Sequence, residues 1–191
     1  MTTTVDNRTD VEMLETMLLI RAFEDHNVGV QASGQGPGTC TSVGQEASAV
    51  GLMRALTPQD LILTNHRSAG HLIARGADPG RMMAEIQGKA TGYCGGKSGP
   101  LHISVKELGV ILTSTIVGGE LSLAPGVAMS QSVLGKEGIV VCIFGDGAAS
   151  EVHLTAQLEP VDAGRHRDAL RRGLPERRAG NAHLPAAADQ L

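Results

Sequence analysis

One carboxylate, Asp146, stands between two glycines directly after an apolar run. The run, residues 139–144, is six apolar residues, mainly β-branched or aromatic, and is typical of a central, buried strand of a parallel sheet. The glycines let the backbone turn sharply and let a ligand come close to it. Because open α/β sheets bind ligands at the carboxyl ends of their strands, the pattern indicates a carboxylate that holds a metal ion on a diphosphate. An ordinary tight turn after a strand is the alternative interpretation.

A second group of polar side chains follows the short apolar run at residues 61–64. Arg67 offers a forked, permanently charged donor that suits a phosphate. Its neighbour His66 points in a different direction on an extended backbone, so one of the two faces the ligand and the other supports it. His71 shares a face with Arg67 if a helix begins here. A solvated loop with incidental His and Arg residues is equally compatible with this pattern.

Three glycine-containing segments differ in what they predict. Residues 116–119 permit close approach of a flat ligand, and the helix that follows favours negative charge at its start. Glu120 lies in the first turn of that helix, where we assign it a structural role. Residues 34–38 lack the strand and the spacing of a dinucleotide-binding loop, and residues 92–98 miss the phosphate-loop spacing by one residue.

The elements that must position these residues alternate between helices and strands, which predicts an α/β fold with a parallel sheet. Thr9 and Glu12 resemble a capping box that opens a helix, with apolar residues at helical spacing after it: Val11, Leu14, Leu18 and Ala22. Further helices are expected at residues 45–56, 79–87 and 121–134. The glycine-rich residues 88–99 predict an exposed loop.

Composition and charge exclude several classes of protein. The 191 residues suffice for one domain, and 41% hydrophobic residues permit a core. A net charge of −4 without a basic face argues against nucleic acid as a partner. Three cysteines without a Cys-x-x-Cys pair argue against a disulfide framework or a zinc site and favour a reducing compartment. With neither a signal-like N-terminus nor an apolar run of membrane-spanning length, we expect no membrane partner and a cytoplasmic location.

The character of the sequence changes after Glu151. Residues 152–191 contain no Ile, Met, Phe, Tyr, Lys, Ser or Cys, and Ala, Arg, Leu, Pro and Gly dominate instead. We therefore divide the chain into a partial domain, residues 1–151, and an aberrant, weakly structured tail, residues 152–191. The tail fits a polar linker, a solvated extension, or a shifted reading frame of GC-rich DNA, and we favour the last. Resequencing the source DNA tests the shifted frame, because an unshifted frame with no downstream apolar strands would rule it out.

Taken together and in order, the motifs of residues 14–151 resemble the alpha subunit of the thiamine-diphosphate-dependent 2-oxo acid dehydrogenases, the first component of those complexes. The pyruvate, branched-chain and acetoin enzymes belong to this family. The matching stretches are residues 17–24, 44–47, 65–71, 75–79, 90–94, 116–119 and 145–151. The resemblance implies the N-terminal half of a parallel-sheet thiamine-diphosphate-binding fold, followed by an unrelated Arg/Ala/Pro-rich tail.

The resemblance also implies roles for individual positions. Asp146 matches the magnesium ligand, and Gly147 and Ala148 match the backbone beside the diphosphate. Arg67 matches an arginine that contacts the diphosphate, and His66 holds the neighbouring position, which is usually aromatic.

Two further positions match the residues that touch the aminopyrimidine ring, Val117 and, less closely, Thr115. Thr115 stands where the family has Gly. The Asn-Asn pair that supplies a second magnesium ligand, and a later His-bearing loop, are missing from the pattern. We therefore expect a fragment truncated after the Gly-Asp-Gly motif that is inactive by itself.

By resemblance, the parent enzyme is an oxidoreductase that acts on pyruvate or acetoin. It cleaves its substrate oxidatively and passes the acyl group to a lipoyl carrier, with thiamine diphosphate and Mg²⁺ as cofactors. The implied partners are a beta subunit, which supplies the activating carboxylate, and a lipoyl acyltransferase, so no residue of this chain is assigned as a catalytic base. Two alternatives are half of a transketolase-like enzyme and a non-catalytic module for subunit interaction.

Overall fold

The computed structural model describes residues 7–150, and the predictions for residues 152–191 lie outside the described residues. The elements in chain order are α1 (Asn7–Ala32), α2 (Glu46–Arg54), β1 (Leu61–Asn65), α3 (Ala69–Ala74), α4 (Pro79–Ile86), the short 3₁₀ helix η1 (Lys106–Leu108), β2 (Val110–Ser114), α5 (Gly119–Val133), β3 (Val140–Cys142) and α6 (Asp146–Ala149). This alternation confirms the α/β class. No helix within residues 7–150 has the length and apolar character that crossing a membrane requires.

The three strands of the described chain form one parallel sheet in the order β2-β1-β3. Asn65 at the end of β1 lies opposite Ser114 at the end of β2, and Leu63 lies opposite Cys142 at the end of β3. Since all three strands run the same way, their carboxyl ends lie at one edge of the sheet. The chain segments that follow the strands, which carry the predicted site residues, therefore meet at this edge.

The positions of two strands differ from the prediction. β3 is only three residues long and half-buried, and within residues 7–150 it is an edge strand, whereas β1 takes the centre with Ile62, Leu63 and Thr64 fully buried. The sequence did not predict β2, because its apolar run is short and Gly109 and Thr115 bracket it closely.

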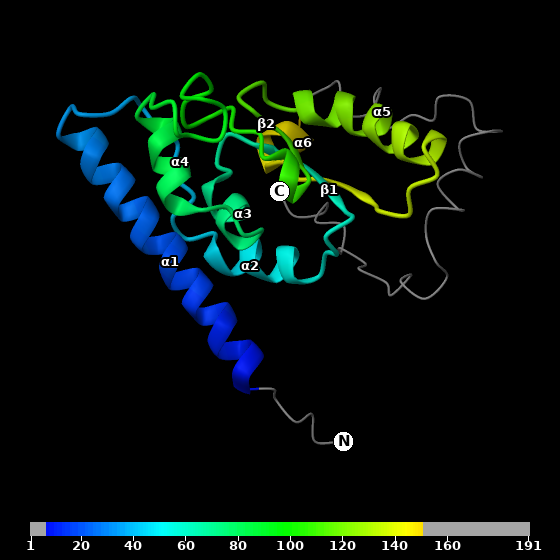
Figure 1. Cartoon of the computed structure of the whole chain (residues 1–191), viewed down its shortest axis with the longest axis horizontal. Coiled ribbons are helices and arrows are strands. Elements are labelled where there is room, and N and C mark those ends of the chain that lie inside the picture. Colours follow the sequence, from blue (N-terminus) through cyan, green and yellow to red (C-terminus); the bar gives the residue numbers. More distant parts are fainter. Residues whose placement is uncertain (1–6, 151–191) are drawn as a thin grey trace, which may run out of the picture.

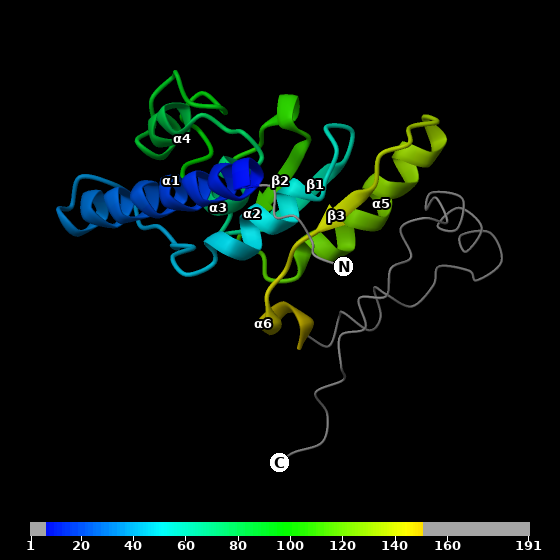
Figure 2. The ribbon, with the colours of Figure 1, turned by 90° about the horizontal axis from the view of Figure 1, so that it is seen from below.

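Helices cover both sides of the sheet. The first three helices, α1, α2 and α3, pack against one another, whereas α5 packs across all three strands. In Figure 1 the strands lie between α5 and the pair α2–α3, and the view in Figure 2 agrees with this. The main core forms around buried residues of α1 to α4 and of the segment that leads into β2, namely Ile20, Phe23, Val50, Leu72, Ile73, Ala77, Met82, Ile86, Ile103, Val105 and Val110.

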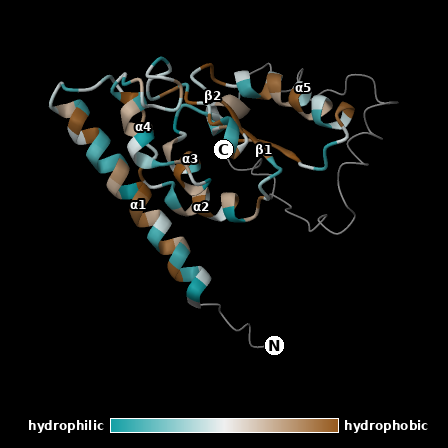
Figure 3. Cartoon of the chain, viewed as in Figure 1, coloured by the Kyte–Doolittle hydropathy of each residue, from teal (hydrophilic) through white to brown (hydrophobic). Residues whose placement is uncertain are grey.

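The predicted apolar stripe of α1 is not its buried face. Val11, Leu14 and Leu18 are more than half exposed, whereas Ile20 and Phe23 are buried in the core. Figure 3 shows hydrophobic and hydrophilic residues alternating along α1, with no single apolar side. The capping-box prediction is also wrong, because α1 already includes Thr9 within its helical turns.

Two other helices follow the sequence closely. Helix α2 matches its predicted range within a few residues at its end. Helix α4 begins at Pro79, and the side chain of Asp78 caps it by accepting the backbone N–H of Arg81 at 2.7 Å. A capping carboxylate and a first-turn proline suit a helix start because they leave few backbone N–H groups without a partner.

The glycine-rich residues 88–99 form a loop of turns that is largely exposed at its start, as predicted, and a buried carboxylate holds this loop to the core. Glu85 is fully buried and accepts the backbone N–H groups of Cys94 (2.7 Å), Gly96 (2.9 Å) and Ser98 (2.7 Å). Gly92 packs so closely on Glu85 that an added Cβ atom would overlap the Glu85 backbone. The glycines here permit a compact turn around one charge.

Candidate cofactor-binding pocket

A pocket of about 570 Å³ opens at the carboxyl edge of the sheet. Its walls come from the segments that follow β1, β2 and β3, with a contribution from the start of α2. The lining residues are Gln45, Ser48, Asn65, His66, Arg67, His71, Ser114, Ile116, Val117, Gly118, Glu120, Ile143, Phe144, Gly145, Asp146, Gly147 and Ala148.

The pocket brings together six of the seven residues that the sequence predicted to bind cofactor, namely His66, Arg67, Val117, Asp146, Gly147 and Ala148. The seventh, Thr115, is not among the lining residues. Its Oγ1 atom lies 3.3 Å from Nε2 of His102, on the exposed surface beside the pocket. The loop between β2 and α5 thus faces the pocket through Val117, with Thr115 turned to His102.

Arg67 is exposed on the pocket wall and held in place by two contacts. Its backbone N–H donates to Oδ1 of Asn65 at 2.8 Å, which closes a tight turn after β1. Its guanidinium donates through Nη1 to the carbonyl oxygen of Thr41 at 2.6 Å. The remaining guanidinium donors are available to an anion in the pocket.

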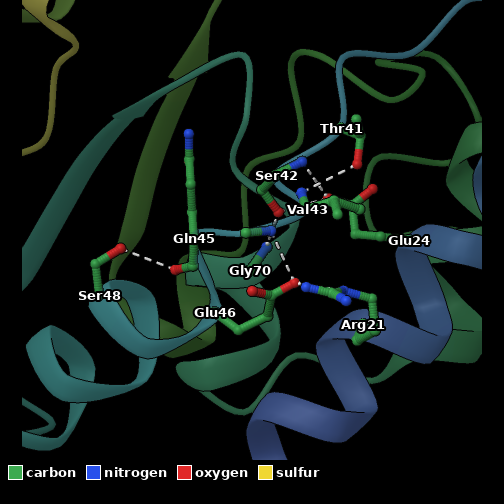
Figure 4. A network of polar contacts seen from close by, with 10 residues as sticks. Arg21, Glu24, Thr41, Ser42, Val43, Gln45, Glu46, Ser48 and Gly70 are labelled. Carbon is green, nitrogen blue, oxygen red and sulfur yellow. Dashed lines mark hydrogen bonds and ion pairs between the residues drawn. The ribbon is translucent and has the colours of Figure 1, made fainter.

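A polar network fixes the loop that carries Thr41 (Figure 4). The Oε1 atom of Glu24 accepts both the backbone N–H (2.8 Å) and the hydroxyl (2.5 Å) of Ser42, and the Ser42 hydroxyl accepts the N–H of Gly70 at 3.3 Å. Because the bonded groups come from α1, the loop and α3, they set the position of the loop beside Arg67.

A second carboxylate of the same network forms an ion pair. Glu46 accepts Nε of Arg21 at 2.7 Å and the backbone N–H of Gly44 at 3.0 Å, as Figure 4 shows. The hydrogen bond from Arg21, followed by that from Gly44, lowers the pKa of Glu46 to about 2. The ion pair and the Glu24 contacts together order residues 41–46, which include the pocket-lining Gln45.

His71 lies in the pocket wall as a neutral imidazole. It is buried on α3, and its Nδ1 atom lies 2.9 Å from the hydroxyl of Thr64 on β1. Burial lowers the pKa of His71 to about 4, so the ring carries no charge at neutral pH. His71 can therefore exchange a hydrogen bond with a ligand but adds no positive charge.

Asp146 is the first residue of α6 and is exposed on the pocket side. The flanking glycines do not have positive φ angles, so the turn into α6 uses backbone angles that other residues could also adopt. A Cβ atom added at Gly145 or Gly147 would meet nothing within 4 Å. The glycines thus leave open space beside the carboxylate, where a ligand can approach the backbone.

The wall contributed by the loop after β2 is apolar. Gly118 has a φ angle of 74°, a left-handed conformation that favours glycine, and it places Ile116 and Val117 on the outside of the turn. Ile116, Val117 and Phe144 are exposed large hydrophobic residues that all line the pocket. One side of the pocket therefore suits a flat apolar ring, and another carries Arg67 and Asp146 for charged groups.

Glu120 is the functional candidate that the sequence did not reveal. Its side chain is 1% exposed, lines the pocket, and its Oε2 atom has no hydrogen-bond partner within residues 7–150. A glutamate in the first turn of a helix is so common a partner of the helix dipole that its residue type carries no signal of a site.

These residues fit a diphosphate with a divalent cation. Arg67 suits phosphate oxygens, and the carboxylates of Asp146 and Glu120 are oxygen ligands of the kind that Mg²⁺ prefers. Within the described residues, no group of three or more His, Cys, Asp or Glu side chains could hold a metal ion. A cation in this pocket would therefore take its other ligands from phosphate and water, as Mg²⁺ commonly does.

Comparison with known proteins identifies the fold family. Residues 14–159 match the family model described as dehydrogenase E1 component. The chain belongs to this E1 family. The match includes all three strands whose ends form the pocket and all the pocket-lining residues.

Relatives of this E1 chain are named for two substrates. It is 44% identical over 140 residues to the alpha subunit of acetoin:2,6-dichlorophenolindophenol oxidoreductase from Bacillus subtilis, covering 73% of this chain and 42% of the relative. It is 37% identical over 143 residues to the alpha subunit of the pyruvate dehydrogenase E1 component from Zymomonas mobilis, covering 74% of this chain and 40% of the relative. The chain thus spans about two fifths of the length of the relatives it matches.

Proposed function

We propose that the pocket binds thiamine diphosphate together with Mg²⁺, and that the chain is the corresponding part of an E1 alpha subunit. The observation that carries this proposal is the convergence of Arg67, Asp146 and Val117 on one pocket from three separate strand ends. The E1 family implies the cofactor, and the pocket offers a polar and an apolar wall that match its two chemically different ends.

Each residue has a defined task in this proposal. Arg67, oriented by the Thr41 carbonyl, binds diphosphate oxygens. Asp146 binds the magnesium ion, and Gly147 and Ala148 bring the backbone close to the diphosphate. Val117, with Ile116 and Phe144, contacts the aminopyrimidine ring and excludes water from it. When bound, the cofactor supplies the thiazolium carbon that attacks the carbonyl group of a substrate, while the protein binds and orients it.

His66 and Thr115 have supporting tasks. His66 lines the pocket beside Arg67 and helps to shape the diphosphate end. Thr115 holds the loop before Val117 through the contact of its Oγ1 atom with His102, and we retain the proposal that its backbone touches the aminopyrimidine ring.

For the whole enzyme, we propose an acetoin-type reaction in which an acyl group passes to a lipoyl carrier. Support comes from the acetoin-named relative at 44% identity, compared with 37% for the pyruvate-named relative. A beta subunit and a lipoyl acyltransferase are the partners that such a reaction requires. The three free cysteines fit a reducing compartment such as the cytoplasm. Membership of the E1 family favours this reading over a transketolase-like half or a non-catalytic module.

A thermal-shift experiment tests the cofactor assignment. We expect thiamine diphosphate with Mg²⁺ to raise the melting temperature of the chain in a saturable way, because a ligand that binds the folded state stabilises it by mass action. Arg67→Met should remove most of this rise by deleting the phosphate donor, whereas Arg54→Met, which breaks an exposed ion pair with Glu12, should retain it. An equal rise in both variants, or none in the unaltered protein, would contradict the assignment.

A further inference from the structure

The carboxylate of Glu120 is buried, although no described protein group forms a hydrogen bond to one of its oxygens. Its side chain is 1% exposed, and Oε2 has no partner in the described part of the chain. Burial of a carboxylate oxygen without a hydrogen-bond partner is costly. The helix dipole at the N-terminus of α5 offsets only part of this cost. The pocket therefore carries an acceptor that protein contacts do not satisfy.

The surroundings of Glu120 place this acceptor at the pocket. Glu120 lies in the first turn of α5, which packs against the end of β3, and it lines the same cavity as Asp146. Burial raises the pKa of the nearby Cys142 to about 11, and the negative charge of Glu120 adds to this effect. The charge of Glu120 thus acts on the thiol of Cys142, at the end of the strand that leads to Asp146.

The charges of the pocket walls are unbalanced. Besides two histidines, of which His71 is kept neutral by burial, the acidic and basic side chains that line the pocket are Arg67, Asp146 and Glu120. Two carboxylates face one guanidinium, which already donates to Thr41. A diphosphate would add further negative charge, so a divalent cation must accompany it, and that cation is the natural partner of both carboxylates.

We propose that Glu120 is a second acidic side chain that holds the divalent cation, acting with Asp146 either directly or through a water bound to the metal. This inference rests on the proposed function, since the cation is the one that the diphosphate carries. Magnesium is commonly bound by one or two carboxylates together with phosphate oxygens and water. Oε2 of Glu120 supplies an oxygen ligand that is already desolvated, where attraction to a cation is strongest.

Titration with Mn²⁺ in the presence of inorganic pyrophosphate tests the proposal directly. Free Mn²⁺, followed by its electron paramagnetic resonance signal, reports the bound fraction without any need for catalysis. We expect Glu120→Gln to weaken Mn²⁺ binding about tenfold or more, comparable to Asp146→Asn, because each loses one charged oxygen ligand. Glu137→Gln removes the same charge from an exposed position just after α5 and should bind Mn²⁺ like the unaltered protein.

Folding of each variant is checked by circular dichroism and thermal unfolding before the titration. A folded Glu120→Gln protein that binds Mn²⁺ as tightly as the unaltered protein would overturn the proposal, as would failure of the unaltered protein to bind Mn²⁺. Tight Mn²⁺–pyrophosphate binding that depends on Glu120, without any binding of thiamine diphosphate, would support the cation site and contradict the proposed cofactor instead.

Discussion

Glu85 and Glu120 are both buried glutamates on helices, but they differ in how many hydrogen-bond donors surround their carboxylates. Glu85 accepts three backbone N–H groups of the glycine-rich loop. Burial alone would raise the pKa of Glu85, but these hydrogen bonds outweigh burial and lower it. Glu120 keeps an oxygen without a partner in the described chain and faces the pocket. One carboxylate completes the fold, and the other leaves a site to be completed by a ligand.

The difference shows how the same residue type serves stability or function. A buried charge that backbone donors satisfy can hold a loop without any ligand. A buried charge that lacks donors lowers the stability of the empty protein but raises its affinity for a cation. Buried polar groups that lack a partner, and so lower stability, are concentrated at sites that bind ligands.

The largest expected effect is on the loop around Glu85. Glu85→Ala should reduce the free energy of unfolding by at least about 3 kcal/mol, because three partly buried N–H groups lose a charged acceptor. Urea denaturation measures this change. Glu107→Ala, which breaks only an exposed pair with Arg81, should cost less than about 1 kcal/mol. If Glu85→Ala lowered the free energy of unfolding as little as Glu107→Ala, the buried carboxylate of Glu85 would not stabilise the fold as this comparison with Glu120 requires.

A pH titration extends the comparison to His71 in the pocket wall. The pKa of His71 is lowered from 6.5 to about 4 by burial, so the unfolded state binds the proton more readily than the folded state. This contribution to stability is complete above the unfolded pKa of 6.5 and is lost as the pH falls toward 4. Between about pH 7 and pH 5 the free energy of unfolding should fall by about 2 kcal/mol.

The variant His71→Gln should remove this decline, because the amide does not titrate but can still bond to Thr64. His26→Gln, which deletes an exposed imidazole on α1, should leave it unchanged. The pKa of Glu46, lowered to about 2, affects stability only as the pH falls below about 4.5, so it does not interfere in this range. An unaltered decline in His71→Gln would show that His71 is not responsible.

The smallest expected effect is a gain in stability at Glu120. In the absence of cation, Glu120→Gln should raise the free energy of unfolding by about 1 kcal/mol, because a neutral amide is less costly to bury than a carboxylate. This net gain already includes the loss of the favourable helix-dipole interaction, which is worth about 0.3–1 kcal/mol. Thermal unfolding in a chelating buffer measures the change. Destabilisation by 1 kcal/mol or more would mean that Glu120 is satisfied within the protein.

The sequence predicted the elements whose signals are local. The apolar residues of β1, and the Asp-Pro start of α4 with its capping bond from Arg81, appear in the structure as expected. Arg67 and Asp146, which the sequence predicted to bind cofactor, line the same pocket, because each follows a strand and parallel strands end at one edge.

The rest depends on contacts between distant segments. Helix α1 has apolar residues on more than one side, and only packing against α2 and α3 selects Ile20 and Phe23 as the buried ones. Glu85 and Glu120 are ordinary helix residues in the sequence. Their roles arise from a loop that folds back onto α4 and from a helix that packs over β3, neither of which has a local signature.

A crystal structure with thiamine diphosphate and Mn²⁺ bound is the most direct measurement of the central claim. Anomalous scattering would locate the cation independently of the protein atoms. The account predicts a cation peak in contact with the Asp146 carboxylate and diphosphate density against the Arg67 guanidinium. A cation and diphosphate bound away from the carboxyl edge of the sheet, or Asp146 turned out of the pocket in the complex, would contradict it.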